Sequence, residues 1–177
     1  MTTLLTIFFI VVTLVAIFLL TGLFVKNDFN IERKIVIDKP VNEVFHYIRH
    51  LKNQDQYSKW VMMDPNMKKD FRGTDGAVGF VYAWDGNREA GKGEQEIIRI
   101  DENKMLEVEL RFEKPFKSVA QAPFVTEAVS ETQTRVTWTM SGTTKYPMNV
   151  MNLITGGLLV IVREESLHGL KNRLEQK

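Results

Sequence analysis

Hydrophobic positions follow three different patterns along the chain, and each pattern predicts a different kind of element. Residues 3–25 form one apolar run without a charged side chain. Most of residues 30–141 alternates between apolar and polar positions in short segments, which is typical of antiparallel strands. Residues 147–176 carry apolar side chains at helical spacing. The order of these patterns indicates an anchoring helix, then a sheet, then a long terminal helix.

The apolar run near the N-terminus predicts a membrane-spanning helix. Of its 23 positions, 17 are Leu, Ile, Phe or Val, and at about 0.4 kcal/mol each they favour insertion by about 7 kcal/mol. As a helix the run is about 35 Å long, enough to cross a hydrocarbon core of about 30 Å. A cleaved signal peptide is the alternative, but the run is too long and has neither a basic flank nor a small-residue cleavage site. We therefore expect residues 1–25 to be a single-pass anchor that contacts the lipid bilayer through residues 3–25.

The distribution of positive charge predicts the orientation of this anchor. No Lys or Arg precedes the run, whereas Lys26, Arg33 and Lys34 follow it. The positive-inside rule therefore places the folded part on the cytoplasmic side of the cell membrane. Residues 26–29 alone connect the run to the first predicted strand, and so short a linker reaches about 14 Å at most. The folded domain, residues 30–177, is expected to lie against the lipid surface.

The alternating segments predict an antiparallel sheet with one wet face. Residues 30–38 form the first strand, Pro40 then opens a helix, and a second short helix covers residues 53–60. Turn residues separate six further predicted strands, at residues 69–73, 77–84, 91–100, 104–112, 118–128 and 134–141. The inward face of the strand at 91–100 does not follow from its pattern. Seven antiparallel strands curving around a long C-terminal helix make an α+β helix-grip fold.

The two halves of the predicted C-terminal helix differ. From Arg163 onward the helix is amphipathic, and the charged side chains, that of Arg163 included, are expected in water. The preceding half is apolar nearly all round but too short to span a bilayer, which predicts a buried helix. Gly156 and Gly157 interrupt this half at a cost of about 1 kcal/mol each relative to alanine. These glycines indicate that space is needed there, and we expect a cavity between the helix and the sheet.

Composition and motifs narrow the class of protein. The 177 residues include 23 basic and 22 acidic side chains and no cysteine. The near-neutral balance argues against a nucleic-acid partner, and the lack of cysteine excludes disulfides and thiolate metal sites. Glu43, His46 and His50 share one helical face but lack a further ligand, so no metal site is predicted. No catalytic triad or phosphate-binding loop is found, so no catalytic residue and no cofactor are predicted; the oligomeric state stays open.

Candidate ligand-binding residues are those expected to face the cavity. The ring edges of Tyr82, Trp84 and Trp138 offer polar handles to a mostly apolar ligand, although packing in the core explains these residues equally well. Arg99 is a candidate partner for an anionic head group, whereas His168 is expected in solvent. The predicted cavity lining comprises Trp60, Met63, Phe80, Tyr82, Trp84, Arg99, Leu110, Trp138, Gly156, Gly157 and Val160.

The order of elements, together with several local motifs, resembles the SRPBCC superfamily. This superfamily has the START-like fold of polyketide cyclase/dehydrases and lipid-transfer domains. The matching motifs span residues 30–177 and lie at residues 35–45, Trp60 with 64–67, 91–94, 111–116, 134–142 and 169–175. The resemblance implies a deep, largely apolar pocket between the sheet and the C-terminal helix. Because the matching residues are framework positions, it implies no catalytic set.

Three functions are compatible with these observations. The first is a membrane-tethered binding module for a hydrophobic small molecule or lipid, held between the sheet and the C-terminal helix. The second is a polyketide cyclase/dehydratase-like enzyme acting on an apolar or aromatic substrate in the same cavity, which requires an inward-facing polar pair with a perturbed pKa. The third is an assembly factor that binds another protein through an exposed apolar patch.

Overall fold

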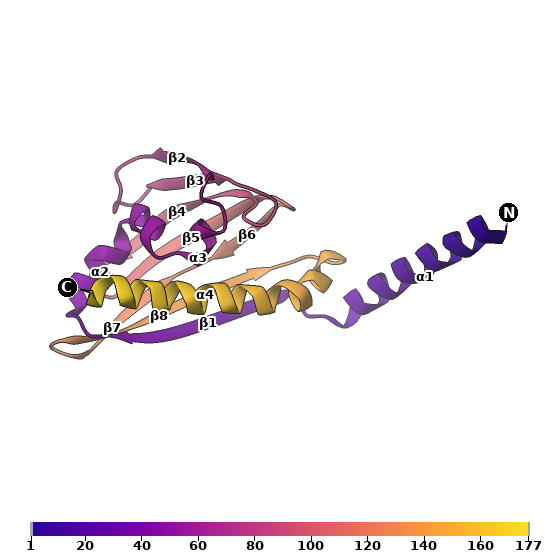
Figure 1. Ribbon diagram of the computed structural model, residues 1–177. Helices are drawn as coiled ribbons and strands as arrows, with labels where there is room; N and C mark the ends of the chain where they lie inside the picture. Colours follow the sequence, from indigo (N-terminus) through magenta and orange to yellow (C-terminus); the bar gives the residue numbers. More distant parts are fainter. Residues whose placement is uncertain (1, 177) are drawn as a thin grey trace.

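The structure, a computed structural model that describes residues 2–176, combines one antiparallel sheet with helices that cover its inner face (Figure 1). The helical elements of this part of the chain are α1 (Thr2–Phe24), α2 (Val41–Arg49), the 3-10 helix η1 (Leu51–Gln56), α3 (Lys59–Met62), the 3-10 helix η2 (Met148–Val150) and α4 (Met151–Glu175). The strands are β1 (Asp28–Ile37), β2 (Lys68–Arg72), β3 (Val81–Asp85), β4 (Lys92–Asp101), β5 (Met105–Lys114), β6 (Ser118–Gln121), β7 (Phe124–Ser130) and β8 (Gln133–Thr143). The predicted α+β class is confirmed.

The sheet of the described residues contains eight strands, in the order β1-β8-β6-β5-β4-β3-β2. β6 and β7 share one place in this order, because both lie between β5 and β8. A single strand was predicted at residues 118–128, but the chain breaks it at Ala122 and Pro123. Proline has no N–H to donate to the ladder, so the regular pairing is interrupted there, although Ala122 N still donates to Val108 O and Pro123 O still accepts from Thr139 N. The strand count is eight instead of the predicted seven for this reason.

The starts of two strands, β1 and β3, lie two or more residues from the predicted positions. β3 begins at Val81 and not at residue 77, because residues 74–79 form turns in which Gly76 and Gly79 have φ values of +80° and +84°. That region favours glycine and does not continue a strand. β1 begins at Asp28, so that fewer residues separate α1 from the sheet than predicted.

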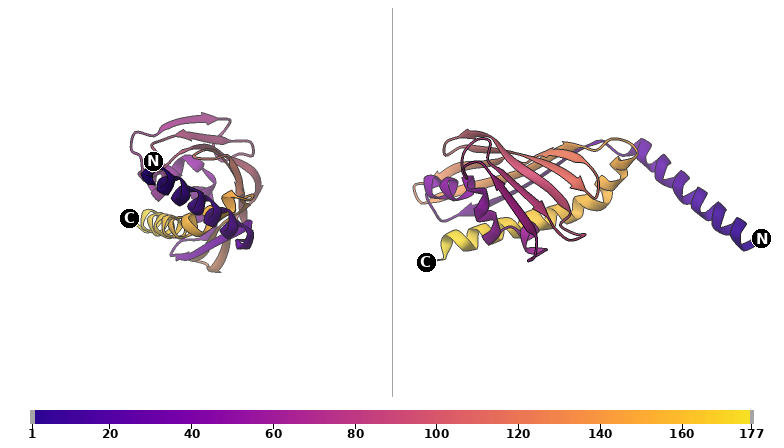
Figure 2. Two further views of the ribbon diagram at one scale, coloured as in Figure 1. Left: turned by 90° about the vertical axis from the view of Figure 1, so that its right-hand side faces the viewer. Right: turned by 90° about the horizontal axis from the view of Figure 1, so that it is seen from above.

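The second half of α4 forms the core with the concave face of the sheet (Figures 1 and 2). Leu167, Leu170 and Leu174 of this half are buried against a cluster that includes Ile37 of β1 and Val44 of α2. They follow the predicted helical stripe. Burying such leucine side chains contributes about 1.5–3 kcal/mol each, which fixes α4 across the sheet.

The first half of α4 is not buried all round, contrary to the prediction. Leu153, Ile154, Leu158 and Ile161 are 64, 67, 48 and 55% exposed. Leu159 on the opposite side lines a cavity. This half has the sheet on one side only, so its outer side has no protein to cover it. We call these four exposed residues the outer face of α4.

Helix α1 projects away from the rest of the structure (Figure 2). Its residues 3–24 form one helix long and apolar enough to cross a membrane, and the most apolar stretch of this helix has a mean hydropathy of 3.0 and is 0% buried. The end of α1 is joined to the start of α4. The Asn149 side-chain amide donates to the carbonyl oxygens of Gly22 and Val25 at 2.7 and 2.8 Å. Because the last carbonyls of a helix lack helical partners, these bonds hold the end of α1 in place.

Candidate functional site

Two adjoining cavities lie between the sheet and α4. The inner cavity encloses about 70 Å³ beneath the middle of α4, and the outer cavity encloses about 200 Å³ beneath its first turns. Trp60, Phe112, Met140 and Leu159 line both, so these four side chains form the partition between them. Asn152 lines the outer cavity and donates its amide to Lys26 O and Asn27 O, at 3.3 and 3.2 Å. The outer cavity therefore lies next to the end of α1.

Part of the predicted lining reaches these cavities. The inner cavity is lined by Trp60, Tyr82, Trp84, Leu110 and Trp138, and the outer cavity by Trp60 and Gly156. The residues on strands are Tyr82 and Trp84 of β3, Leu110 of β5 and Trp138 of β8. Alternation along each strand turns these side chains toward α4, as its pattern predicted. All three tryptophans of the chain line the inner cavity.

Five predicted residues line neither cavity. Phe80 is buried but stacks on Phe71, with ring centroids 6.3 Å apart. Met63 is half-buried and Met67 of the same loop reaches the inner cavity instead. Gly157 lies on the exposed side of α4, and Val160 is half-buried outside both cavities. The fifth residue is Arg99.

The prediction that Arg99 holds a ligand is not supported by its position. Its side chain is 61% exposed, and its nearest acidic partner is Glu107 at 3.9 Å. The register of β4 against β5 shifts between Ile97 and Arg99. This bulge ends the simple alternation, so Ile97 is buried while Ile98 and Arg99 are both exposed.

Charged side chains, that of Arg111 among them, collect on the outer side of the sheet. The Arg111 guanidinium donates to Glu96, Glu109 and Glu94 at 2.6, 2.7 and 2.8 Å. The hydrogen bonds that Arg111 donates to these carboxylates, the one to Glu96 first, raise the pKa of Arg111 despite its partial burial. The outer side of β4 and β5 is thus a network of ion pairs, separate from the cavities.

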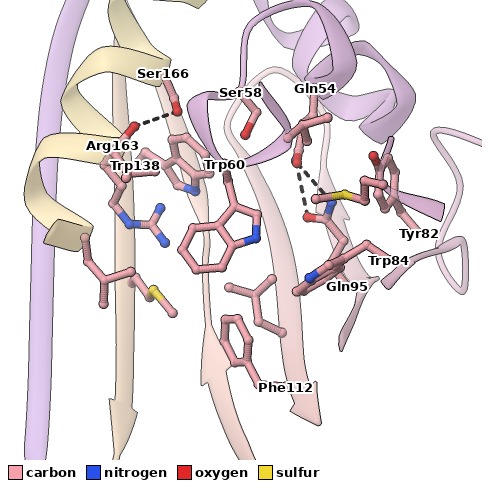
Figure 3. Close-up of a pocket in the computed structure, with 16 residues that line it drawn as sticks. Gln54, Ser58, Trp60, Tyr82, Trp84, Gln95, Phe112, Trp138, Arg163 and Ser166 are labelled. Atoms are coloured by element: carbon pink, nitrogen blue, oxygen red, sulfur yellow. Dashed lines mark hydrogen bonds between the residues drawn. The ribbon is translucent and has the colours of Figure 1, made fainter. Parts of the chain in front are cut away.

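Two amides form the polar end of the inner cavity (Figure 3). Gln95 Nε2 donates to Gln54 Oε1 at 2.9 Å, and Gln54 Nε2 donates to Gln95 Oε1 at 3.3 Å. Both side chains are buried, so each amide satisfies the other. Amides do not titrate near neutral pH, and this pair therefore supplies no general acid or base.

The reciprocal amide pair leads to a stability prediction. We expect Gln95→Leu alone to lower the free energy of unfolding by about 1–3 kcal/mol, because the Gln54 amide is left buried without a partner. Changing both residues to leucine is expected to restore most of this loss. Urea unfolding followed by circular dichroism measures the two effects. If Gln54→Leu and Gln95→Leu each lower the free energy of unfolding and the double variant shows the sum of the two losses, the amides are not coupled.

Among the described residues that line the inner cavity, Tyr82 and Arg163 carry titratable side chains. The Tyr82 hydroxyl donates to Asp55 Oδ1 at 2.7 Å, and Asp55 also pairs with Lys69 at 2.9 Å. Burial, followed by the bond to Asp55, raises the pKa of Tyr82. A phenol held neutral, with its proton directed at a carboxylate, is a fixed wall group and a poor base near neutral pH. The arrangement favours binding over proton transfer.

Arg163 is the buried charged residue of the site that sequence reasoning missed. It was expected in water, but it is 6% exposed and its guanidinium extends from α4 into the inner cavity (Figure 3). The guanidinium carbon lies 4.4 Å from the centre of the Trp138 ring. Burial lowers the pKa of Arg163 to about 9. The spacing held a usable signal, since Arg163 is seven residues from both Gly156 and Leu170 and so shares their face of the helix.

Comparisons with known proteins support the fold and not a specific activity. No family model matches the chain, and no curated protein does. Solved structures do match. Truncated norcoclaurine synthase from Thalictrum flavum has a TM-score of 0.63 at 10% identity, over 85% of this chain and 96% of its own. A hypothetical protein from Helicobacter pylori has a TM-score of 0.63 at 11% identity, over 85% and 89% of the two chains.

A third solved structure, the Aha1 dimer from Colwellia psychrerythraea, has a TM-score of 0.55 at 19% identity, over 83% of this chain and 96% of its own. At such identities the likeness shows the fold alone. It confirms the helix-grip architecture, and the resemblance to the SRPBCC superfamily stays a prediction.

Proposed function

We propose that the chain is a membrane-tethered binding module that holds a hydrophobic small molecule or lipid in the inner and outer cavities. The observation that carries this proposal is the position of the outer cavity, which lies between the sheet and α4 at the end of an apolar helix. Apolar and aromatic side chains with a few polar groups are typical of ligand pockets. In this proposal α1 spans the cell membrane and the domain faces the cytoplasm, in line with the positive charge after the span.

The outer face of α4 supports the proposed contact with lipid. Tyr146 and Met148, which precede α4, are also exposed, at 47 and 37%. Together with the outer face they form an apolar surface. This surface begins where α1 ends, because Asn149, which follows Met148 and precedes α4, bonds to the last turn of α1. An apolar helix face beside a membrane-spanning helix fits the interfacial layer of a bilayer. With this face in lipid, the first half of α4 would separate the bilayer from the outer cavity.

Native mass spectrometry of the full chain tests the proposal directly. After release from a phospholipid nanodisc, the protein is expected to retain a small lipophile with one-to-one stoichiometry. Organic extraction then identifies that molecule. A chain that stays empty, even after incubation with a lipid extract, would refute a binding function for the cavities.

The adjacent glycines of α4 provide a matched pair of variants. A Cβ built on Gly156 or on Gly157 meets no atom within 4 Å, so both positions have open space where a side chain would begin. Gly156 lines the outer cavity, whereas Gly157 lies on the exposed side. We expect Gly156→Leu to reduce the retained lipophile about tenfold, because the new side chain occupies the cavity. Gly157→Leu gains the same helix propensity and should leave retention unchanged; an equal loss in both variants would point to a general effect on α4.

A further inference from the structure

The inner cavity has a feature that an apolar ligand alone does not explain. The Nε and Nη1 atoms of Arg163 are buried, and no atom of the described residues 2–176 accepts a hydrogen bond from them. Buried charges in proteins are normally paired, because an unpaired one has lost its water without compensation. The acidic residues next in sequence do not supply the pairing. Glu164 pairs with Arg33 at 3.7 Å and Glu165 with Lys59 at 2.8 Å, both on the surface.

Two further donors of the same cavity also lack acceptors in this part of the chain. The indole nitrogens of Trp60 and Trp138 are buried and unpaired, and both rings line the inner cavity. An indole N–H and a guanidinium can only donate hydrogen bonds. The described residues that line the cavity include no aspartate or glutamate. The cavity therefore has an excess of donors, and it is complementary to a ligand rich in acceptors.

The amides of the wall and the Ser166 hydroxyl are already satisfied. Gln54 and Gln95 bind each other. Ser166 Oγ donates to Val162 O at 2.6 Å and accepts from Lys59 N at 2.9 Å. Arg163 is thus the charged group of the inner wall that stays available to a ligand.

We propose that the inner cavity binds the anionic head group of a single-chain acidic amphiphile through Arg163, an inference that rests on the proposed binding function. Trp138 lies against the face of the guanidinium, at 4.4 Å. A guanidinium stacked on a ring keeps the N–H groups at its edge free, and these N–H groups bind a carboxylate or phosphate in bidentate fashion. The ring therefore fixes the cation in place without occupying its hydrogen-bonding edge.

The two cavities give the ligand its direction and its size. The apolar chain would run from the head group past Trp60, Phe112 and Leu159 into the outer cavity, toward the end of α1. Volumes of about 70 and 200 Å³ lie at or below the low end for small-molecule pockets, about 300 Å³. This size suits one acyl or alkyl chain and not a two-chain phospholipid. The charged residues of the outer cavity, Arg88 and Glu89, are exposed at its rim and do not compete for a buried head group.

The tryptophans make the proposal measurable on the full chain in phosphatidylcholine nanodiscs. Because all three line the inner cavity, a bromine-labelled fatty acid should quench their fluorescence on binding. Brominated dodecanoic acid and its methyl ester are titrated in parallel, and dodecyl phosphate is added as a competitor. The acid is expected to bind the wild-type chain about tenfold more tightly than the ester.

Substitutions separate the charge of Arg163 from its bulk. Arg163→Met is expected to weaken binding of the acid about tenfold or more and to leave the ester within about twofold. Arg163→Lys should retain part of the preference for the acid, because it keeps the charge but loses the planar edge. Arg173→Met is the matched control, since Arg173 lies on the same helix but is exposed and lines neither cavity. It should change neither affinity, and circular dichroism verifies the fold of each variant.

The outcomes distinguish this proposal from the binding function on which it rests. Equal affinities for acid and ester, unchanged by Arg163→Met, would overturn the head-group site and leave the binding function intact. A loss of acid binding in Arg173→Met and not in Arg163→Met would also overturn it. If neither ligand quenches the wild-type chain, the binding function itself fails. Displacement of the acid by dodecyl phosphate, dependent on Arg163, would extend the anionic head group to phosphates, and no displacement would restrict it to carboxylates.

Discussion

Removal of residues 1–25 is expected to convert the chain from an integral membrane protein into one recovered in the aqueous fraction. The 17 large apolar residues of this run favour insertion by about 7 kcal/mol, a partition change on the order of 10⁵-fold. In the described structure, no residue of α1 belongs to the core or lines either cavity. The domain is therefore expected to keep its fold without the helix. Carbonate extraction of membranes followed by ultracentrifugation measures the change.

Two controls sharpen the experiment on α1. N-terminal sequencing of the mature protein identifies a cleaved signal peptide, and cleavage near residue 25 would contradict the anchor. The truncated chain is also tested on liposomes, where the outer face of α4 should still give weak binding. Replacing Leu153 and Ile154 with glutamine is expected to abolish that residual binding without loss of stability, because these side chains are 64 and 67% exposed and line neither cavity.

The fold could be predicted to a large extent because its elements are encoded by local patterns. The alternation in β1 and β5 and the helical spacing of Leu167, Leu170 and Leu174 are each visible in a short stretch of sequence. The division of β6 from β7 was missed although Pro123 marks it. A proline within an alternating run is compatible with an edge strand, and only the tertiary structure places this strand between two neighbours.

The site was predicted less completely, since it depends on which side of each element is covered. By simple alternation Arg99 would share the face of Ile97, but the bulge between the two residues turns Arg99 outward. Arg163 was assigned to water by the ordinary preference of arginine, although its spacing from Gly156 and Leu170 places it on the inner face of α4. The outer face of α4 was expected in a core because an apolar helix half carries no sign of what covers it. Sequence patterns show which residues share a face, and the surroundings of that face come from the fold.

Replacement of Arg163 by methionine is expected to stabilise the ligand-free domain by about 1–3 kcal/mol. A buried, unpaired charge costs several kcal/mol, and stacking on Trp138 offsets about 2 kcal/mol of that cost. Methionine fills a similar volume without a charge. Urea unfolding of the full chain in detergent, with Arg88→Met as control, measures the difference. For an arginine with a structural role, the same substitution would instead lower the free energy of unfolding.

The pH dependence of this difference provides a second, independent check. Burial lowers the pKa of Arg163 to about 9 in the folded state, far below its value in the unfolded chain. Below pH 9 both states hold the proton, and the folded wild type bears the full cost of the buried charge. Above pH 9 the unfolded state holds more protons than the folded state, so the stability of the wild type rises with pH relative to the variant.

The stability advantage of Arg163→Met should therefore be largest near neutral pH and shrink as the pH rises through about 9. Addition of dodecanoic acid at neutral pH should stabilise the wild type and not the variant, because the anion supplies the missing partner of the guanidinium. A variant less stable than the wild type at neutral pH would show that Arg163 already contributes favourably within the empty cavity. In that case the guanidinium would be a structural group, and its open hydrogen-bonding edge would need no ligand.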